Sequence, residues 1–303
     1  SFTTTGTNNI TTVLAGTGGL TNASGSTTLT GTNTYSGGTV VNGGSLNVSG
    51  NGTLGSTSGT TTMNDSTLDL GTTTQTQALV SLSNAIATNG TFNNTAILGN
   101  GGSNTTATAL IGTSSVTNAA GTNILTSTGN SYTGGNTITG GTLQVATTSS
   151  LGATTNNLSI SGNGTLDLQT GTQTQGNVTV TNGNIINGTL TNSGITFTGG
   201  SNNITAALAG AGGLTNASGS TTLSAANLYS GGTVINNGQV TATVDNALGA
   251  SGNTLTVNSN STLTLTGTAQ TNGVVALNGS TLTGGTLSGT SFTTTGTNNI
   301  GTV

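Results

Sequence analysis

One recurring stretch constrains the fold more than any other feature of the chain. Residues 20–48 read LTNASGSTTLTGTNTYSGGTVVNGGSLNV, residues 214–244 repeat this text closely, and residues 116–145 carry a more divergent copy. Self-similarity at a fixed period indicates repeats that stack on one another, because a single repeat cannot bury its own apolar face. The chain is therefore expected to be a repeat protein.

Two markers give the period as 97 residues. They are the tyrosine of each copy and the leucine of a following Leu-Gly turn, at Tyr35, Tyr132 and Tyr229 and at Leu54, Leu151 and Leu248. This period predicts one continuous array over residues 1–303 with modules at about 8–103, 104–201 and 202–297, and residues 298–303 starting the next copy. Because SFTTTGTNNI occupies both 1–10 and 291–300, we expect a segment of a longer array.

The composition narrows the class of protein. The 303 residues include no Lys, Arg, His, Cys, Pro or Trp, and the only charged side chains are Asp65, Asp69, Asp167 and Asp245. An ordinary soluble domain carries about a quarter charged residues, so this is an unusually uncharged polar chain. Its net charge of −4 is low for a disordered segment, and no apolar run approaches the ~20 residues of a spanning helix. We expect a folded chain with no membrane insertion in this segment.

Short alternating segments predict the secondary structure. Segments such as LNV at 46–48, TLDL at 67–70 and TLTL at 262–265 put apolar side chains on one face of a strand and polar ones on the other. The Gly- and Asn-rich stretches between them supply turn residues that accept a positive φ. No apolar stripe of helical period competes with this pattern. The sequence predicts an all-β chain.

A parallel β-solenoid accounts best for these strands. Each coil of a solenoid buries its inward Val, Leu and Ile against the coils above and below. Coils of roughly 20 residues would give about five per module. An array of β-sandwiches is the alternative, although the modules have no linkers at their ends. The solenoid predicts that Leu68, Leu166 and Leu263 point inward in equivalent coils, and that Asn side chains at stacked turns form ladders.

The stretch at 18–48 also carries a family resemblance. It resembles the passenger-associated transport repeat of bacterial autotransporters. The hallmark of that repeat is a Gly-rich lead, a T-L-x-L-x-G strand, then N-x-Y-x-G-G-T and G-x-L-x-V. The coils after it, such as 247–267, are similar to those that usually follow the repeat. This resemblance implies a right-handed β-helix passenger at the surface of a Gram-negative-type cell, anchored in the outer membrane or secreted. Family members typically carry a charged residue where this chain has Asn22, Asn118 and Asn216.

The residue types exclude most catalytic chemistry. Without His, Lys, Arg or Cys the chain offers no catalytic triad, no thiol nucleophile and no basic partner for a carboxylate. We expect no enzyme, no cofactor and no metal site, and we expect the aspartates to be outward-facing and solvated. Calcium would need several carboxylates together. Nucleic acid is excluded as a partner, because neutralising its phosphates requires Lys or Arg.

The aromatic residues are the remaining candidates for a site. Tyr35, Tyr132 and Tyr229 each precede S-G-G or T-G-G, which favours a packed corner whose hydroxyl bonds to the protein. A role in stacking on a glycan is the alternative. The four phenylalanines are expected in the core: Phe2, Phe92, Phe197 and Phe292.

Three functions are compatible with these observations. The first is an extracellular structural or adhesive surface protein, a rod or fibre that extends, attaches to host or matrix glycans, or associates with itself end to end or laterally. Its uncharged surface would not repel a second copy. The second is a Thr-rich face that binds ice or a polysaccharide surface, although the threonines show no single register along the sequence. The third is a glycan-active β-helix enzyme, which the missing basic residues disfavour.

Overall fold

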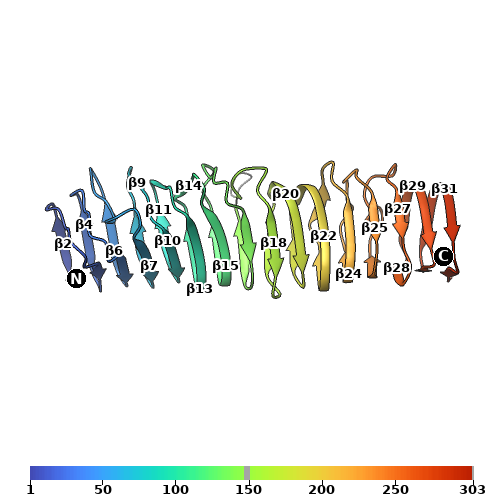
Figure 1. Ribbon diagram of the computed structural model, residues 1–303, viewed down its shortest axis with the longest axis horizontal. Helices are drawn as coiled ribbons and strands as arrows, with labels where there is room; N and C mark the ends of the chain where they lie inside the picture. Colours follow the sequence, from blue (N-terminus) through green and yellow to red (C-terminus); the bar gives the residue numbers. More distant parts are fainter. Residues whose placement is uncertain (147–150, 302–303) are drawn as a thin grey trace. The chain divides into compact units, whose positions relative to one another are not determined.

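The structure of the protein is a computed structural model that describes residues 1–146 and 151–301. It contains two compact units, Ser1–Asn156 and Asn157–Val303. Each unit is a parallel β-solenoid, and no described residue is helical. The strands of successive coils lie side by side within each unit (Figure 1). The predicted all-β solenoid is confirmed, whereas the module limits and the continuity over 1–303 stay predictions.

The first unit winds through seventeen described strands. They are β1 (Phe2–Thr4), β2 (Thr7–Ile10), β3 (Leu20–Asn22), β4 (Ser26–Leu29), β5 (Thr39–Asn42), β6 (Ser45–Val48), β7 (Thr60–Asn64), β8 (Thr67–Asp69), β9 (Thr74–Gln75), β10 (Leu79–Ser83), β11 (Ile86–Thr88), β12 (Thr91–Phe92), β13 (Ala96–Thr106), β14 (Ala109–Leu110), β15 (Ser115–Leu125), β16 (Asn136–Ile138) and β17 (Thr142–Val145).

The second unit has the same kind of winding. Its described strands are β18 (Leu158–Ser161), β19 (Thr165–Asp167), β20 (Thr172–Thr181), β21 (Asn184–Ile186), β22 (Thr189–Ile204), β23 (Ala207–Ala209), β24 (Leu214–Leu223), β25 (Thr233–Ile235), β26 (Gly238–Ala242), β27 (Leu255–Val257), β28 (Ser261–Leu265), β29 (Ala269–Asn278), β30 (Thr281–Thr283), β31 (Thr286–Thr295) and β32 (Asn299–Ile300).

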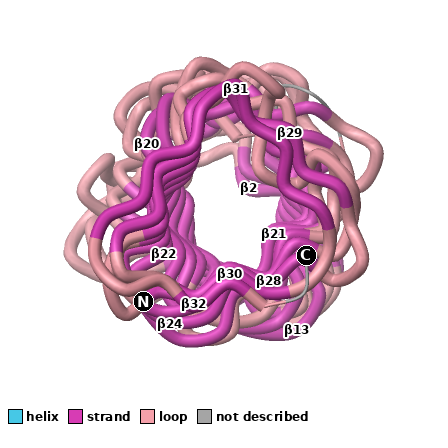
Figure 2. Tube along the Cα trace, turned by 90° about the vertical axis from the view of Figure 1, so that its right-hand side faces the viewer, coloured by secondary structure: helices cyan, strands magenta, loops and turns pink. Residues whose placement is uncertain are grey.

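Parallel pairing stacks each coil on the next. Thr39 of β5 pairs with Thr61 of β7, 22 residues further on, whereas Leu79 of β10 pairs with Ala96 of β13 after 17 residues. Five such steps lead along one face from Thr21 to Thr117. The predicted five coils per repeat are therefore confirmed. Figure 2 shows the strands lying around the interior and the loops projecting outside them.

Side chains alternate between the interior and the solvent along most of the described strands. In β6 the pattern runs from half-buried Ser45 to buried Leu46, then half-buried Asn47 and buried Val48. Leu68, Leu166 and Leu263 are each fully buried, as predicted for equivalent coils. Stacking is thus what buries the apolar side chains, because each coil is only one strand thick.

Two of the four phenylalanines do not lie in the core. Phe92 and Phe197 are fully buried, but Phe2 is 45% exposed and Phe292 is 53% exposed. The inward direction predicted from the sequence is not enough to bury them, because β1 and β31 are covered by a neighbouring coil on one side only in the structure. The prediction that all four are core residues was wrong for Phe2 and Phe292.

Asparagine ladders connect neighbouring coils on the outside. In the second unit the carboxamide of Asn258 donates to Asn236 at 2.8 Å, and Asn278 donates to Asn258 at 2.9 Å. In the first unit Asn64 donates to Asn42 at 2.8 Å. The predicted Asn ladders are confirmed. Each adds a side-chain bond parallel to the backbone ladder, and so fixes the register of adjacent coils.

Candidate functional site: the tyrosine corners

The three tyrosines occupy equivalent corners of their coils. Each lies in the loop that precedes a strand, namely β5, β16 and β25. Their exposed fractions are 3% for Tyr35, 0% for Tyr132 and 1% for Tyr229. The rings therefore belong to the interior of the corner, which leaves no accessible ring face on which a sugar could stack.

Each hydroxyl enters the same short chain of hydrogen bonds. The Tyr35 hydroxyl lies 2.6 Å from Thr39 Oγ1, and that oxygen donates to the carbonyl of Leu54 at 3.2 Å. Tyr229 repeats this geometry with Thr233 at 2.6 Å. Because the threonine proton is committed to a carbonyl, the tyrosine is the donor.

The divergent second copy keeps the chain of bonds with a different residue. Tyr132 donates to Asn136 Oδ1 at 2.6 Å, and the Asn136 carboxamide donates to the carbonyl of Leu151 at 3.1 Å. Thr and Asn both combine an acceptor with a donor, so either can transmit the bond. What the three copies share is the connection from tyrosine to the Leu-Gly turn of the next coil.

The glycine of that Leu-Gly turn is required by the tyrosine ring. Gly55 and Gly249 have φ of +84° and +88°, in the region that side chains other than glycine rarely adopt. A Cβ at Gly249 would lie 2.7 Å from a ring carbon of Tyr229, and one at Gly55 would lie 2.6 Å from a ring carbon of Tyr35. The tyrosine and the Leu-Gly turn, which both recur every 97 residues, are therefore the two sides of one contact.

Burial makes these hydroxyls poor acids. Desolvation raises the pKa of Tyr35 to about 12, and the hydrogen bond to Thr39 opposes this rise to a smaller extent. Desolvation likewise raises the pKa of Tyr132 and of Tyr229, each against the weaker opposing effect of its hydrogen bond. A tyrosine that serves as a general base needs a lowered pKa, so these hydroxyls are suited to donating a fixed hydrogen bond.

A second recurrent residue in this corner escaped the sequence reasoning. Asn33 is 2% exposed; its Oδ1 accepts from the Leu14 amide at 2.9 Å, and its Nδ2 donates to the Thr53 carbonyl at 2.8 Å. Asn227 makes the equivalent bonds to Leu208 and Ala247, at 2.7 and 2.6 Å. One carboxamide thus joins three successive coils. The N-x-Y spacing was the available signal, since this asparagine always lies two residues before the tyrosine.

The asparagines that replace a charged residue of the family pattern are also buried. Asn22, Asn118 and Asn216 are each fully buried inside the solenoid. Asn22 Oδ1 accepts from Thr27 at 2.7 Å and its Nδ2 donates to the Gly43 carbonyl at 3.2 Å. A buried polar group is tolerated when it is hydrogen-bonded in this way, whereas an unpaired charge is not. These asparagines therefore form hydrogen bonds inside the solenoid and do not face a partner.

The aspartates lie at turns, and one of them is buried although it was predicted to be solvated. Asp65 and Asp245 are exposed and Asp69 is half-buried. Asp167 is only 8% exposed. Its Oδ1 accepts from the Gln169 amide at 3.0 Å and from Asn187 at 2.8 Å, and its Oδ2 accepts from the Gln169 carboxamide. Because Gln169 folds back over the carboxylate, the prediction of a solvated side chain was wrong for Asp167.

The threonines keep a register that the sequence did not reveal. In the second unit Thr222, Thr241, Thr264 and Thr283 stand next to one another in successive coils, each half-buried on the outer side. The interpretation that the threonines share no single register was wrong. Because successive coils differ in length, these threonines are unevenly spaced in the sequence, although stacking places them side by side.

Within the described ranges, no group of three or more His, Cys, Asp or Glu could hold a metal ion. Over the same part of the chain, no helix is long and apolar enough to span a membrane.

Comparison with known proteins identifies the recurring stretch. The model of the passenger-associated-transport-repeat matches residues 24–48, 120–145 and 218–242, so each match ends at the last residue of the second strand after a tyrosine corner, which is β6, β17 or β26. Searches of curated proteins and of solved structures found no significant match. The chain is therefore a β-solenoid that carries three passenger-associated transport repeats, which is consistent with a passenger of the autotransporter type.

Proposed function

We propose that this chain is a structural and adhesive part of a bacterial surface or secreted protein. In this proposal it extends away from the cell and mediates attachment or self-association, and it has no enzymatic role. One observation carries the proposal: the polar residues that recur at the tyrosine corners are hydrogen-bonded to their own coil and to the neighbouring coils. The tyrosines, the N-x-Y asparagines and the Leu-Gly turns are all used to close corners.

The charge of the surface supports the same role. The chain has no Lys or Arg and four acids, so two copies have little electrostatic repulsion to overcome. For the same reason trypsin has no site in the chain. A surface protein of this kind would resist proteases that cleave after Lys or Arg.

Display on a cell tests this proposal. The chain would be fused to a heterologous autotransporter translocator and displayed on cells that do not clump. Clumping or attachment to a glycan-coated surface is expected, and it should survive trypsin. Leu166→Asp, which puts a charge into the fully buried core, is the control for dependence on the fold at equal surface amounts. Dispersed, unattached cells carrying the intact chain would refute the proposal.

A second candidate function rests on the threonine row. Thr262 and Thr281 pair beside the Thr264–Thr283 pair, so neighbouring coils present Thr-x-Thr on the same outer face. Hydroxyls and methyl groups repeating at the ~4.8 Å spacing of strands suit a regular solid such as ice or crystalline cellulose. Retention of the purified chain on either solid, lost in Thr264→Tyr, would favour this function; no retention would exclude it.

A further inference from the structure

A cavity in the first unit lies over the bends of four successive coils. It has a volume of about 430 Å³ and reaches from the turn between β5 and β6, past the β7–β8 and β10–β11 turns, to the middle of β13. Parallel pairing stacks these bends on one another, because Ser45 pairs with Thr67, Thr67 with Ile86, and Ile86 with Thr105. A cavity of this size can hold a small organic ligand.

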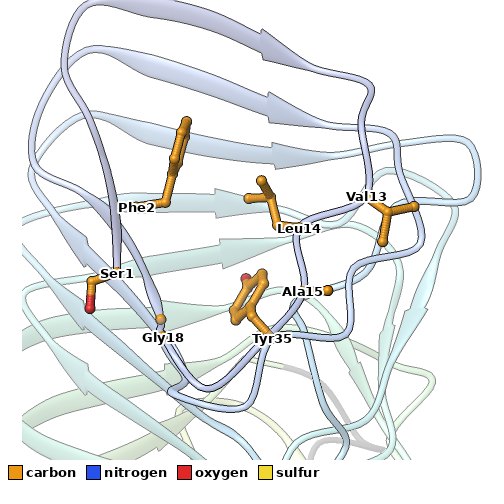
Figure 3. Close-up of a pocket in the computed structure, with 8 residues that line it drawn as sticks. Ser1, Phe2, Val13, Leu14, Ala15, Gly18 and Tyr35 are labelled. Atoms are coloured by element: carbon orange, nitrogen blue, oxygen red, sulfur yellow. The ribbon is translucent and has the colours of Figure 1, made fainter.

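A carboxylate distinguishes this cavity from two other hollows of the chain. The hollow beside Leu14 and Tyr35 (Figure 3) and the hollow beside Leu228 have no acidic side chain among the described residues that line them. The cavity over the bends is lined by the exposed Asp65, with no second charged side chain among its described lining residues. Calcium prefers several carboxylates. A lone carboxylate instead suits a ligand whose hydroxyl groups donate hydrogen bonds.

The fold does not require a carboxylate at this position. Asp65 lies three residues before the buried leucine of its coil, and Asn163 and Asn260 hold the same place in the other two copies. All three accept a positive φ, of +46°, +62° and +62°. Asn84 donates to Asp65 Oδ1 at 2.7 Å, as Asn182 donates to Asn163 Oδ1 at 2.8 Å. Either residue type therefore completes the turn and its ladder, and Asp65 Oδ2 remains as an acceptor.

The residue after Asp65 has a buried hydroxyl without a partner. Ser66 lines the cavity and is 6% exposed, and its Oγ has no hydrogen-bond partner among the described residues. In the third copy Ser261 holds the same place and donates to the Ile235 carbonyl at 3.1 Å. A buried hydroxyl without a partner costs free energy. Because the Ser66 hydroxyl turns about a single χ1 bond, a ligand oxygen in the cavity can become its partner.

An apolar side chain completes the lining. Ile86 is 43% exposed on the outer face and stands between Thr67 and Thr105 of the adjacent coils. The same place is polar in the other two copies, where it holds Asn184 and Thr281. A single exposed isoleucine needs no explanation by itself. Beside a carboxylate and an unpartnered hydroxyl, however, it gives the cavity one apolar and one hydrogen-bonding side.

We propose that this cavity binds one uncharged pyranose ring of a glycan. Hydroxyl groups of the sugar donate to the Asp65 carboxylate and bond to Ser66 Oγ, while a C–H face of the ring packs on Ile86. Anionic sugars such as sialic or uronic acids are disfavoured, because Asp65 repels a second carboxylate. This site deepens the proposed attachment to glycans and rests on it.

NMR with simple sugars tests the site. Saturation-transfer difference titrations of the purified 303-residue chain would use the methyl glycosides of glucose, galactose, mannose and N-acetylglucosamine. At least one should bind, and the methyl glycoside of N-acetylneuraminic acid should not. Asp65→Asn, which introduces the residue of the other two copies, should weaken binding about tenfold through the lost charge-assisted hydrogen bond. Ile86→Thr should weaken it roughly threefold through the lost apolar contact.

A matched control separates the cavity from the charge of the chain. Asp245→Asn removes the same charge from an exposed turn of the second unit, and should bind like the unmodified chain. Far-UV circular dichroism and Tm should be unchanged in Asp65→Asn and Ile86→Thr. No bound glycoside, undiminished binding in Asp65→Asn, equal loss in Asp245→Asn, or binding abolished by EDTA would each overturn the proposal. Cells that display the intact chain and clump, while the purified chain binds no glycoside, would leave the proposed function standing and refute only this site.

Discussion

Tyr35, Tyr132 and Tyr229 are the residues at which the chain responds to alkaline pH. With no Lys, Arg or Cys in the chain, tyrosine is the only side chain that titrates above neutrality. An unfolded tyrosine ionises near pH ~10, whereas burial raises the pKa of Tyr35 to about 12. The folded state therefore gains stability from neutral tyrosine that is fully present below the unfolded pKa and is lost as the pH rises through the folded one.

We predict that Tm falls as the pH rises from about 10 to 12, because only the unfolded chain can ionise its tyrosines over this range. Tyr35→Phe should lower Tm at neutral pH through the lost hydrogen bond to Thr39, and should make the alkaline decline shallower. Melting followed by far-UV circular dichroism at graded pH measures both. An identical decline in the variant would contradict the assignment.

Gly249 is sensitive to a single added methyl group. Its φ is +88°, and an added Cβ would lie 2.5 Å from the Asn253 carboxamide and 2.7 Å from the Tyr229 ring. We predict that Gly249→Ala lowers the free energy of unfolding by about 2 kcal/mol, from left-handed strain and overpacking together. Gly252→Ala is the control in the same turn, because a Cβ there meets nothing within 4 Å. Equal losses in urea denaturation of the two variants would refute the ring contact.

At the scale of the coil, buried carboxamides fix one corner on the next. Asn227 accepts a hydrogen bond from the Leu208 amide of the coil before and donates one to the Ala247 carbonyl of the coil after. At the corner there is no strand to pair with the backbone groups, and the carboxamide supplies their hydrogen-bond partners instead. Corners are therefore as continuous in hydrogen bonding as the strands that they join.

We predict that Asn227→Ala costs about 2–4 kcal/mol of stability, because a buried amide and a buried carbonyl both lose their partner. Asn203→Ala is the matched control, since Asn203 is exposed on the outer side of β22, and it should change stability by less than about 0.5 kcal/mol. Thermal melts of the two variants give the comparison. A small effect at Asn227 would mean that water replaces the carboxamide.

The strands and their inward leucines were predictable, because alternation and the repeat fix both. Leu68 needed only the L-x-L pattern and the period. Which asparagines are buried was not predictable in the same way. Asn33 is buried and Asn203 is exposed, although both lie in stretches rich in small polar residues, since the difference depends on which coil passes beside each one. Asp167 was missed for the same reason, because Gln169 covers it from two residues away.

At the scale of the whole molecule, stability is a sum of contacts between neighbouring coils. Leu68 is fully buried and stacks between Leu46 and Ala87, while Leu263 stacks between Val240 and Leu282. Repeat proteins of this kind lose stability locally, because each coil contacts only its neighbours. A cavity in one coil should therefore lower the stability of that coil and of the adjacent coils most strongly.

We predict that Leu68→Ala lowers the local opening free energy by about 2–5 kcal/mol at β6, β8 and β11, with a much smaller effect in the second unit. Leu263→Ala should show the converse distribution, centred on β26, β28 and β30. Native-state amide hydrogen exchange resolves the two patterns. Uniform loss of protection over the whole chain in both variants would show that the coils unfold as one cooperative body.

The tyrosine corner also gives the chain a built-in optical reporter. With no Trp and three tyrosines, nearly all of its near-ultraviolet absorbance comes from rings held against a turn glycine in the same geometry. A near-ultraviolet circular dichroism band from such rings reports the packing of the corners directly. Loosening of a single corner would remove about one third of that band.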